Sequence, residues 1–148
     1  MRVLMFLALR DDGLATIAVI AKAYGISKNN LMKVAHQLGL AGYIETVRGK
    51  GGGLRLARPP QDIALGEVVR RSEPDMALVP CLAHDDASCA IHPSCALRGV
   101  LSEAGDALLS VLDKHTLADL VRPRAPLQKL LSFKPNGRAA ALRLARRA

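Results

Sequence analysis

Apolar residues in the first forty positions recur at helical spacing. Residues 2–10 are almost entirely apolar and predict a short buried helix. A second helix is predicted to begin after Thr16, whose hydroxyl suits an N-cap, and to end at Gly25. Its apolar positions follow the i, i+3, i+4, i+7 pattern of one helix face: Ile17, Ile20, Ala21 and Tyr24.

A third helix follows after a tight turn, which makes the pattern that of a helix-turn-helix. Ser27 is the expected N-cap, and Gly39 is the expected end. The side chains predicted to point inward are Leu31, Val34 and Leu38. Two β-prone runs come next, residues 43–48 and 54–57, around a glycine-rich tip at 49–53. A hairpin in this place predicts a wing and a mainly α, winged helix-turn-helix fold.

The outward face of the third helix and the wing tip carry donors suited to DNA. No acidic residue occurs between Gly13 and Tyr43, whereas an ordinary solvated helix face mixes both signs of charge. A phosphate-cradling nucleotide loop is the competing interpretation of the glycine run, but such a loop opens a helix, and here a strand follows. The candidate DNA-binding residues are Ser27, Lys28, Asn29, Asn30, Lys33, His36, Arg48 and Lys50.

The second half predicts a short helix at 65–72 and a long one ending near Lys114. Few residues follow the long helix to cover the apolar stripe along it, which favours a symmetric dimer interface over intrachain packing. The expected interface residues are Leu97, Val100, Leu101, Ala104, Leu108, Val111 and Leu112. We expect a DNA-binding domain at 1–78, a cysteine loop with dimerisation helices at 79–133, and a disordered basic tail at 134–148.

The charge distribution indicates an acidic partner. The chain of 148 residues has a formal charge of +8 and a pI near 9.9. Residues 1–60 carry +6 and residues 134–148 carry +5, so the middle is mildly acidic. Nucleic acid is the first expectation and an anionic membrane the second. The longest apolar run has seven residues, and no signal-peptide cleavage pattern follows it, so we expect a cytoplasmic protein.

All three cysteines lie in one polar loop, spaced C-x7-C-x5-C, as Cys81, Cys89 and Cys95. Exposed residue types between them argue against cysteines packed in a core and favour a metal or redox centre. Spacing alone leaves zinc and an iron–sulfur cluster equally open, because histidines are interleaved. Cysteine oxidation without a metal is a third option. A catalytic Cys89–His92 pair is remote, since no oxyanion loop, nucleotide site or paired carboxylates accompany it.

The order of these parts resembles the iron–sulfur winged-helix transcription regulators of NsrR and IscR over residues 1–133. The segments that carry the resemblance are GISKNNLMKV (25–34), AGYI (41–44), VRGKGGGLRL (47–56), CAL (95–97) and VLDKHTLADL (111–120). IscR-like members have a histidine three residues after the last cysteine. Arg98 occupies that position here, which favours the nitric-oxide-sensitive repressors.

The resemblance implies a homodimer that binds a palindromic operator while a 4Fe–4S or 2Fe–2S cluster is intact. Nitric oxide then attacks the cluster and relieves repression. The cluster ligands are expected to be Cys81, Cys89 and Cys95. The family's fourth ligand, an aspartate donated by the partner subunit, is expected upstream of Met1. Here the fourth ligand is unassigned, with His84, Asp85, Asp86 and His92 as local candidates. The first cysteine spacing is also wider than in the family.

Overall fold

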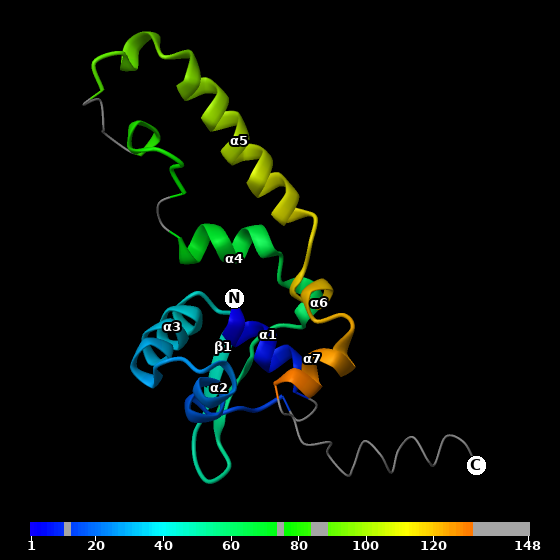
Figure 1. The fold of residues 1–148 in the computed structure, drawn as a ribbon. Coiled ribbons are helices and arrows are strands. Elements are labelled where there is room, and N and C mark those ends of the chain that lie inside the picture. The colour runs from blue at the N-terminus through cyan, green and yellow to red at the C-terminus, as the bar shows by residue number, and fades with distance from the viewer. Residues whose placement is uncertain (11–12, 74–75, 84–88, 132–148) are drawn as a thin grey trace. The chain divides into compact units, whose positions relative to one another are not determined.

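The computed structural model describes residues 1–10, 13–73, 76–83 and 89–131. The chain divides into two compact units (Figure 1). The first unit comprises residues 1–62 and the segment from 117 onward, and the second comprises residues 63–116. No helix in the described ranges is both long and apolar enough to cross a membrane. The predicted basic tail at 134–148 lies outside the described residues.

The core of the first unit is built around α1 (Arg2–Leu9). Six of its eight residues are buried: Val3, Leu4, Phe6, Leu7, Ala8 and Leu9. The helix packs against β2 (Gly53–Leu56), α6 (Leu117–Leu120) and α7 (Arg124–Leu130). On α2 (Ile17–Tyr24), the ring of Tyr24 meets Phe6 edge-on, with the ring centroids 6.1 Å apart. Burial on all sides explains why residues 2–10 are apolar throughout.

Local signals set the boundaries of α2 as predicted. Thr16 Oγ1 accepts a hydrogen bond from the Val19 amide at 3.3 Å, which satisfies one of the free amides at the helix start. Gly25 ends the helix with φ 63°, in the left-handed region that glycine adopts at little cost. Both sequence predictions are confirmed.

The third helix, α3 (Lys28–Leu40), differs from the prediction in two ways. Val34 was predicted to point inward, but it is 42% exposed, and Ala35 is buried between Leu31 and Leu38 instead. The i+4 spacing from Leu31 places Ala35 on the side of the helix that faces the core, so Ala35 rather than Val34 is the buried residue. The helix also passes Gly39, and a left-handed turn forms at Gly42, with φ 74°. Ser27 precedes the helix, but its side chain makes no capping hydrogen bond.

A wing follows the helix-turn-helix. Strand β1 (Ile44–Val47) pairs antiparallel with β2, in a register running from Ile44 opposite Leu56 to Val47 opposite Gly53. Ala15 extends this hairpin by exchanging backbone hydrogen bonds with Leu54 at 3.0 and 2.8 Å. A Cβ on Gly53 would lie 2.8 Å from the Ala15 carbonyl oxygen, so only glycine permits this approach. The mainly α, winged helix-turn-helix fold is confirmed.

The second unit joins α4 (Leu65–Ser72) to the long α5 (Ala96–Asp113). The Leu65 amide donates to the His115 carbonyl at 2.9 Å, next to an isolated bridge between Ala64 and Thr116. Short turns η1 (Pro60–Asp62), η2 (Pro80–Leu82) and η3 (His92–Ser94) complete the described elements. The two points where the chain enters and leaves the second unit are therefore held together.

A bidentate ion pair joins α4 and α5 near that point. Arg70 donates to the two carboxylate oxygens of Asp113 at 2.7 and 2.6 Å. These hydrogen bonds hold the pKa of the Asp113 carboxyl below its ordinary value. A Cβ on Gly66 would overlap Asp113 Oδ1, so glycine in α4 leaves the space that the carboxylate occupies.

Helix α7 was not predicted. Prolines such as Pro123 and Pro126 generally interrupt a helix, but both lie where a helix tolerates them. Pro123 is the N-cap, and Pro126 is in the first turn, whose amides have no partner within the helix. Arg124 donates from its two terminal nitrogens to the carbonyls of Ala8 and Leu9 at 2.8 and 3.1 Å. The side chain thus caps the C-terminal end of α1.

Candidate nucleic-acid interface and metal centre

The outward face of α3 is exposed and free of acidic residues. Every predicted DNA-binding position at the start and along this face is exposed, namely Ser27, Lys28, Asn29, Asn30, Lys33 and His36. The opposite face packs into the core through Leu31, Ala35 and Leu38. A helix fixed by one face and presenting lysine and asparagine on the other has the geometry needed to enter a major groove.

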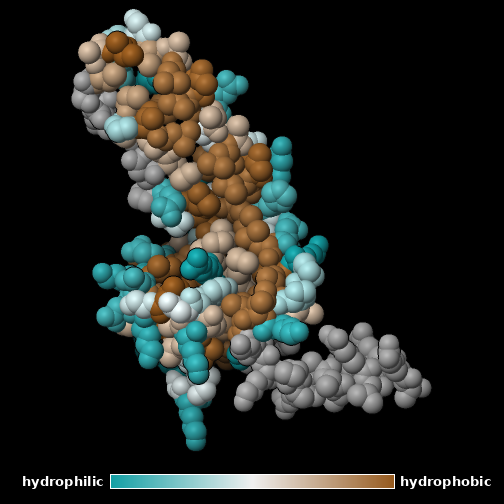
Figure 2. All heavy atoms as spheres, in the orientation of Figure 1, coloured by the Kyte–Doolittle hydropathy of each residue, from teal (hydrophilic) through white to brown (hydrophobic). Residues whose placement is uncertain are grey.

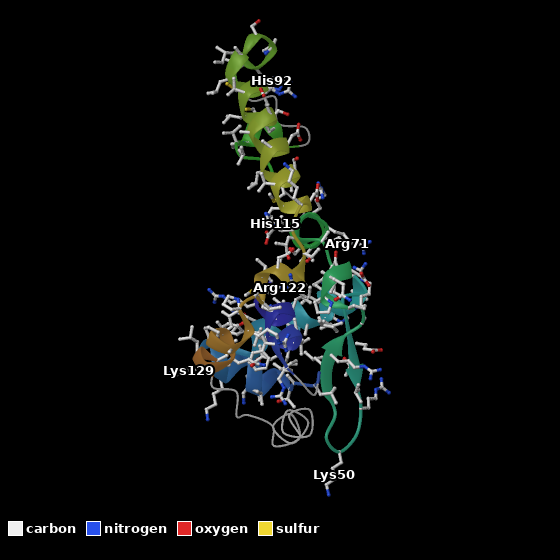
Figure 3. All side chains as sticks on the ribbon, turned by 90° about the vertical axis from the view of Figure 1, so that its right-hand side faces the viewer. Lys50, Arg71, His92, His115, Arg122 and Lys129 are labelled. Atoms are coloured by element: carbon white, nitrogen blue, oxygen red, sulfur yellow. The ribbon has the colours of Figure 1, made fainter. Side chains whose placement is uncertain are left out.

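The wing places its cations at the tip of the hairpin. Arg48 and Lys50 are both exposed, and Figure 3 shows Lys50 projecting from the end of the hairpin. Nearer the base, Arg55 forms an ion pair with Glu45 across the two strands, so that pair adds little net charge. The cations beyond this pair suit contacts with a sugar–phosphate backbone.

The three cysteines lie in the segment that leads into α5. Cys81 is in η2 and is half-buried, Cys89 is exposed, and Cys95 is half-buried immediately before α5. All three are free thiols. Because η2 packs against α5, the segment that carries Cys81 lies beside the helix that Cys95 begins.

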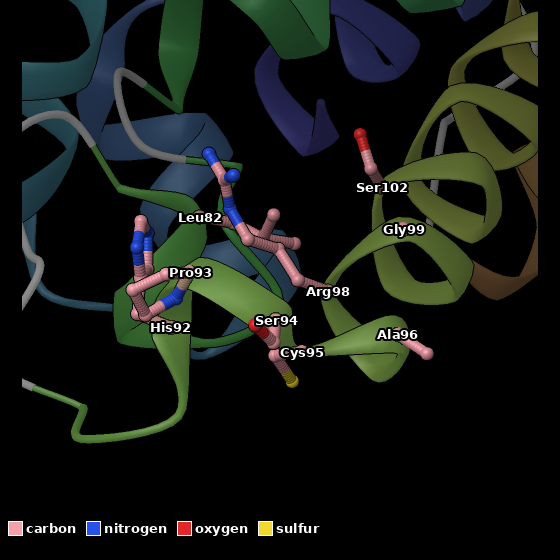
Figure 4. Close-up of a pocket in the computed structure, with 9 residues that line it drawn as sticks. All are labelled: Leu82, His92, Pro93, Ser94, Cys95, Ala96, Arg98, Gly99 and Ser102. Carbon is pink, nitrogen blue, oxygen red and sulfur yellow. The ribbon is translucent and has the colours of Figure 1, made fainter.

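An open pocket of about 470 Å³ lies at this end of α5 (Figure 4). It is lined by Leu82 from η2, by His92 and Cys95, and by Arg98 one turn into the helix. Arg98 extends from the helix toward Leu82 in the close-up. Arg98 is not among the site residues predicted from the sequence. Its spacing of three residues from Cys95 was the signal that it faces the same pocket.

The described residues do not by themselves complete a metal site. Within residues 76–83 and 89–131, no three side chains of cysteine, histidine, aspartate or glutamate gather as metal ligands. His84, Asp85 and Asp86 lie outside the described residues. His92 is half-buried and lines the pocket with Cys95. The donor set still fits a thiolate-bound group in kind, because three reduced cysteines and a histidine are ligands for iron–sulfur clusters and for zinc.

The apolar stripe of α5 divides into two sides. No residue of α5 is buried, and Figure 2 shows apolar side chains gathered along it. Leu101 and Leu112 are half-buried, on the same side of the helix as the half-buried Gly105 and Leu109. The other predicted interface residues are exposed, with Leu97 and Val100 at 61% and 60%: Leu97, Val100, Ala104, Leu108 and Val111.

Comparison with known proteins identifies the group to which this architecture belongs. Residues 1–123 match the model of the Rrf2 family, described as an iron-dependent transcriptional regulator. The chain belongs to the Rrf2 family. The HTH-type transcriptional regulator NsrR of Bacillus subtilis is 51% identical over 135 residues, covering 90% of this chain and 92% of the relative. The NsrR of Geobacillus kaustophilus is 48% identical over 132 residues, covering 88% and 90%.

Solved structures agree with this Rrf2 assignment. T. potens IscR is 26% identical with a TM-score of 0.64, covering 94% of this chain and 88% of that one. CymR, the global cysteine regulator of B. subtilis, is 28% identical with a TM-score of 0.64, covering 80% and 87%. The protein is therefore a DNA-binding transcriptional regulator rather than an enzyme, and the resemblance drawn from its motifs is confirmed.

Proposed function

We propose that this Rrf2 regulator is a repressor that responds to nitric oxide through an iron–sulfur cluster bound by Cys81, Cys89 and Cys95. The observation that carries the proposal is that Cys95 immediately precedes the long α5 helix while the segment with Cys81 packs against that helix, and all three cysteines are free thiols. Relatives at 44–51% identity named NsrR support it. A cluster bound there would supply thiolate-ligated iron that reacts directly with nitric oxide.

The protein's own residues offer a route from the cysteines to the DNA-binding unit. Cys95 precedes α5, and the far end of α5 carries Asp113, which is held by Arg70 of α4. Just beyond, Ala64 and Thr116 form a bridge at the two connections with the first unit. A shift of α5 at its cysteine end would therefore act on both connections together. We keep the division into residues 1–78, 79–133 and 134–148 as a proposal about function, whereas the compact units place α4 with α5 and place α6 and α7 with α1.

We propose that the active form is a homodimer that pairs through α5. The exposed side of the stripe, from Leu97 to Val111, is the surface that a second copy would cover. Burying such side chains contributes about 1.5–3 kcal/mol each, which is enough to offset the cost of association when several are buried together. Two copies would present two α3 helices to a palindromic operator, whose half-sites lie about 34 Å apart.

The cluster is tested by purifying the full chain without oxygen and measuring visible absorption with iron, sulfide and zinc content. We expect broad visible absorption with iron and sulfide, which bleaches on adding nitric oxide. Cys81→Ala, Cys89→Ala and Cys95→Ala should each lose the absorption, whereas Ser94→Ala, beside the third cysteine, should keep it. Colourless protein that contains one zinc per chain would contradict the proposal and favour a zinc site.

The zinc outcome has its own structural support, since His92 and Cys95 line one pocket and Cys89 lies three residues before His92. A structural zinc would leave DNA binding insensitive to nitric oxide. His92→Ala separates the two cases when metal content is measured. It should lower the zinc content of a zinc protein and leave the iron content of a cluster protein unchanged, unless His92 is the fourth cluster ligand. In that last case the cluster itself would become unstable.

The DNA interface is tested with duplexes selected from a random library by the wild-type protein. Lys28→Ala, Asn30→Ala and Arg48→Ala should each weaken binding about tenfold, while Lys129→Ala on α7 should not. Loss of a phosphate contact at Arg48 should also reduce the slope of log affinity against log salt by about 0.9. Unchanged affinity in all three variants, with the dimer intact, would contradict the interface.

A further inference from the structure

A second cleft, unrelated to the cysteines, lies within the first unit. It has a volume of about 520 Å³, which is within the usual range for small-molecule sites. Four elements contribute to it: the end of α1, the turn η1, helix α6 and the start of α7. Its lining residues are Ala8, Arg10, Pro60, Gln61, Ala118, Val121, Arg122 and Arg124.

The charge around this cleft is one-sided. Arg10, Arg122 and Arg124 are the charged side chains among the described residues that line it, and Gln61 adds an amide donor. Arg122 is exposed and makes no ion pair within the described ranges of the chain. Guanidinium groups carry up to five donors each and no acceptor, so three of them around one space favour an anionic occupant.

One of the three arginines is held in place. Arg124 donates to the Ala8 and Leu9 carbonyls, and Gln128 donates to the same Leu9 carbonyl at 2.7 Å. These hydrogen bonds fix the start of α7 against the end of α1, which is the wall of the cleft. A cation already fixed by the fold loses little conformational freedom when a ligand binds, so the site is partly preorganised.

We propose that this cleft binds a small polyanion that carries two or more carboxylate or phosphate groups. Arg10 and Arg122, from two separate segments, suit a ligand with more than one anionic group, because bidentate arginine contacts match both carboxylate and phosphate geometry, and Arg124 adds a fixed positive charge. The proposal does not depend on the cluster or on nitric oxide. A bound anion would bridge the end of α1 to the segment between α6 and α7 and stabilise the first unit.

A DNA phosphate is the less favoured occupant. Figure 1 shows α6 and α7 on the side of α1 away from α3, so the elements that line the cleft lie on the other side of α1 from α3. A duplex in contact with α3 and the wing tip would not reach the cleft by the same face. Free small anions therefore fit the position better than the operator backbone.

The test is titration of the full chain with pyrophosphate and, separately, with citrate, at an ionic strength held constant with potassium chloride. Calorimetry should give one site per chain for at least one of the two, and thermal unfolding should shift upward. Arg122→Gln and Arg10→Gln should each weaken binding about tenfold or more. Lys129→Gln is the matched control, since Figure 3 shows Lys129 on α7, apart from Arg122, and it does not line the cleft.

The pair of probes distinguishes the two ligand chemistries. Preference for pyrophosphate identifies a phosphorylated ligand, and preference for citrate identifies a polycarboxylate. The absence of binding by both, or equal binding by wild type and both cleft variants, overturns the proposal. Loss of affinity for non-operator duplex in Arg122→Gln, with no binding of either anion, overturns it in favour of a DNA contact. Circular dichroism of each variant shows that the fold is retained.

Discussion

Helices α1 and α5 are both rich in apolar residues, but the protein buries only one of them. Six of the eight residues of α1 are buried within the first unit, whereas α5, with 18 residues, has none buried. The difference shows that the first unit completes its core from its own chain. No described residue covers the exposed side of α5, from Leu97 to Val111, and this is the surface that we propose for a second copy.

The largest expected effect comes from the helix that is already buried. Phe6 is 2% exposed and meets Tyr24 edge-on, so Phe6→Ala should leave a cavity and lower the free energy of unfolding by about 3–5 kcal/mol. Chemical denaturation at a fixed protein concentration measures this change. Leu97→Ala on α5 is the comparison, and it should change the free energy of unfolding of isolated monomer by less than about 0.5 kcal/mol. Similar losses in the free energy of unfolding in both variants would contradict the contrast between a buried α1 and an exposed α5.

The next effect concerns the exposed side of α5. Leu108→Glu puts a charge in the proposed interface and should weaken the dimer at least about a hundredfold, because an unpaired charge would be desolvated there. Analytical ultracentrifugation over a range of concentrations measures the shift to monomer, and operator affinity should fall with it. Ser110→Glu, on the opposite side of the same helix, should leave the dimer unchanged. If the Leu108→Glu variant dimerises as tightly as wild type, α5 is not the dimer interface.

The first unit was predictable because short-range chemistry specifies most of it. Thr16 and Gly25 set the limits of α2, and the glycine-rich tip at 49–53 marked the wing. The predictions were wrong where tertiary packing, rather than local sequence, determines the structure. Val34 and Ala35 are adjacent on α3, and only the direction of the core determines that the alanine is buried. Helix α7 was not predicted, because prolines generally interrupt helices, although Pro123 and Pro126 both occupy positions that a helix start tolerates.

The cysteine centre was predictable only as a set of donors. The sequence places three thiols in one polar loop, but a loop has no periodicity from which to derive distances between them. The pocket with Arg98 and Leu82 depends on η2 packing against α5, which is a contact between segments well separated along the chain. The same holds for the arginine cleft. Arg10 is distant in sequence from Arg122 and Arg124, and they meet only because α6 and α7 return to α1.

A smaller effect is expected where α7 caps α1. Arg124→Met removes two hydrogen bonds to the Ala8 and Leu9 carbonyls while keeping most of the side chain's length. We expect a loss of about 1 kcal/mol in the free energy of unfolding, because the bonds are only partly buried and Gln128 still reaches Leu9. Lys129→Met on the same helix should be neutral within about 0.5 kcal/mol. Equal changes in the two variants would show that the cap does not stabilise α1.

The smallest effect is the pH dependence of the ion pair between α4 and α5. The Arg70 hydrogen bonds lower the pKa of Asp113 in the folded protein, so the folded state favours the ionised carboxylate. The pair's contribution is therefore fully present above the ordinary aspartate pKa of 3.8, and it is lost as the pH falls through the lower folded value. Asp113→Asn should be less stable than wild type at neutral pH, and the difference should disappear in acid. Thermal unfolding from pH 7 downward measures this difference in stability at low salt, since both side chains are exposed and screening weakens the pair.

Gly66→Ala should remove the same pH-dependent contribution to stability, because its methyl group would displace the Asp113 carboxylate. If Asp113→Asn is still less stable than wild type in acid, the loss of stability comes from packing instead of from the ion pair.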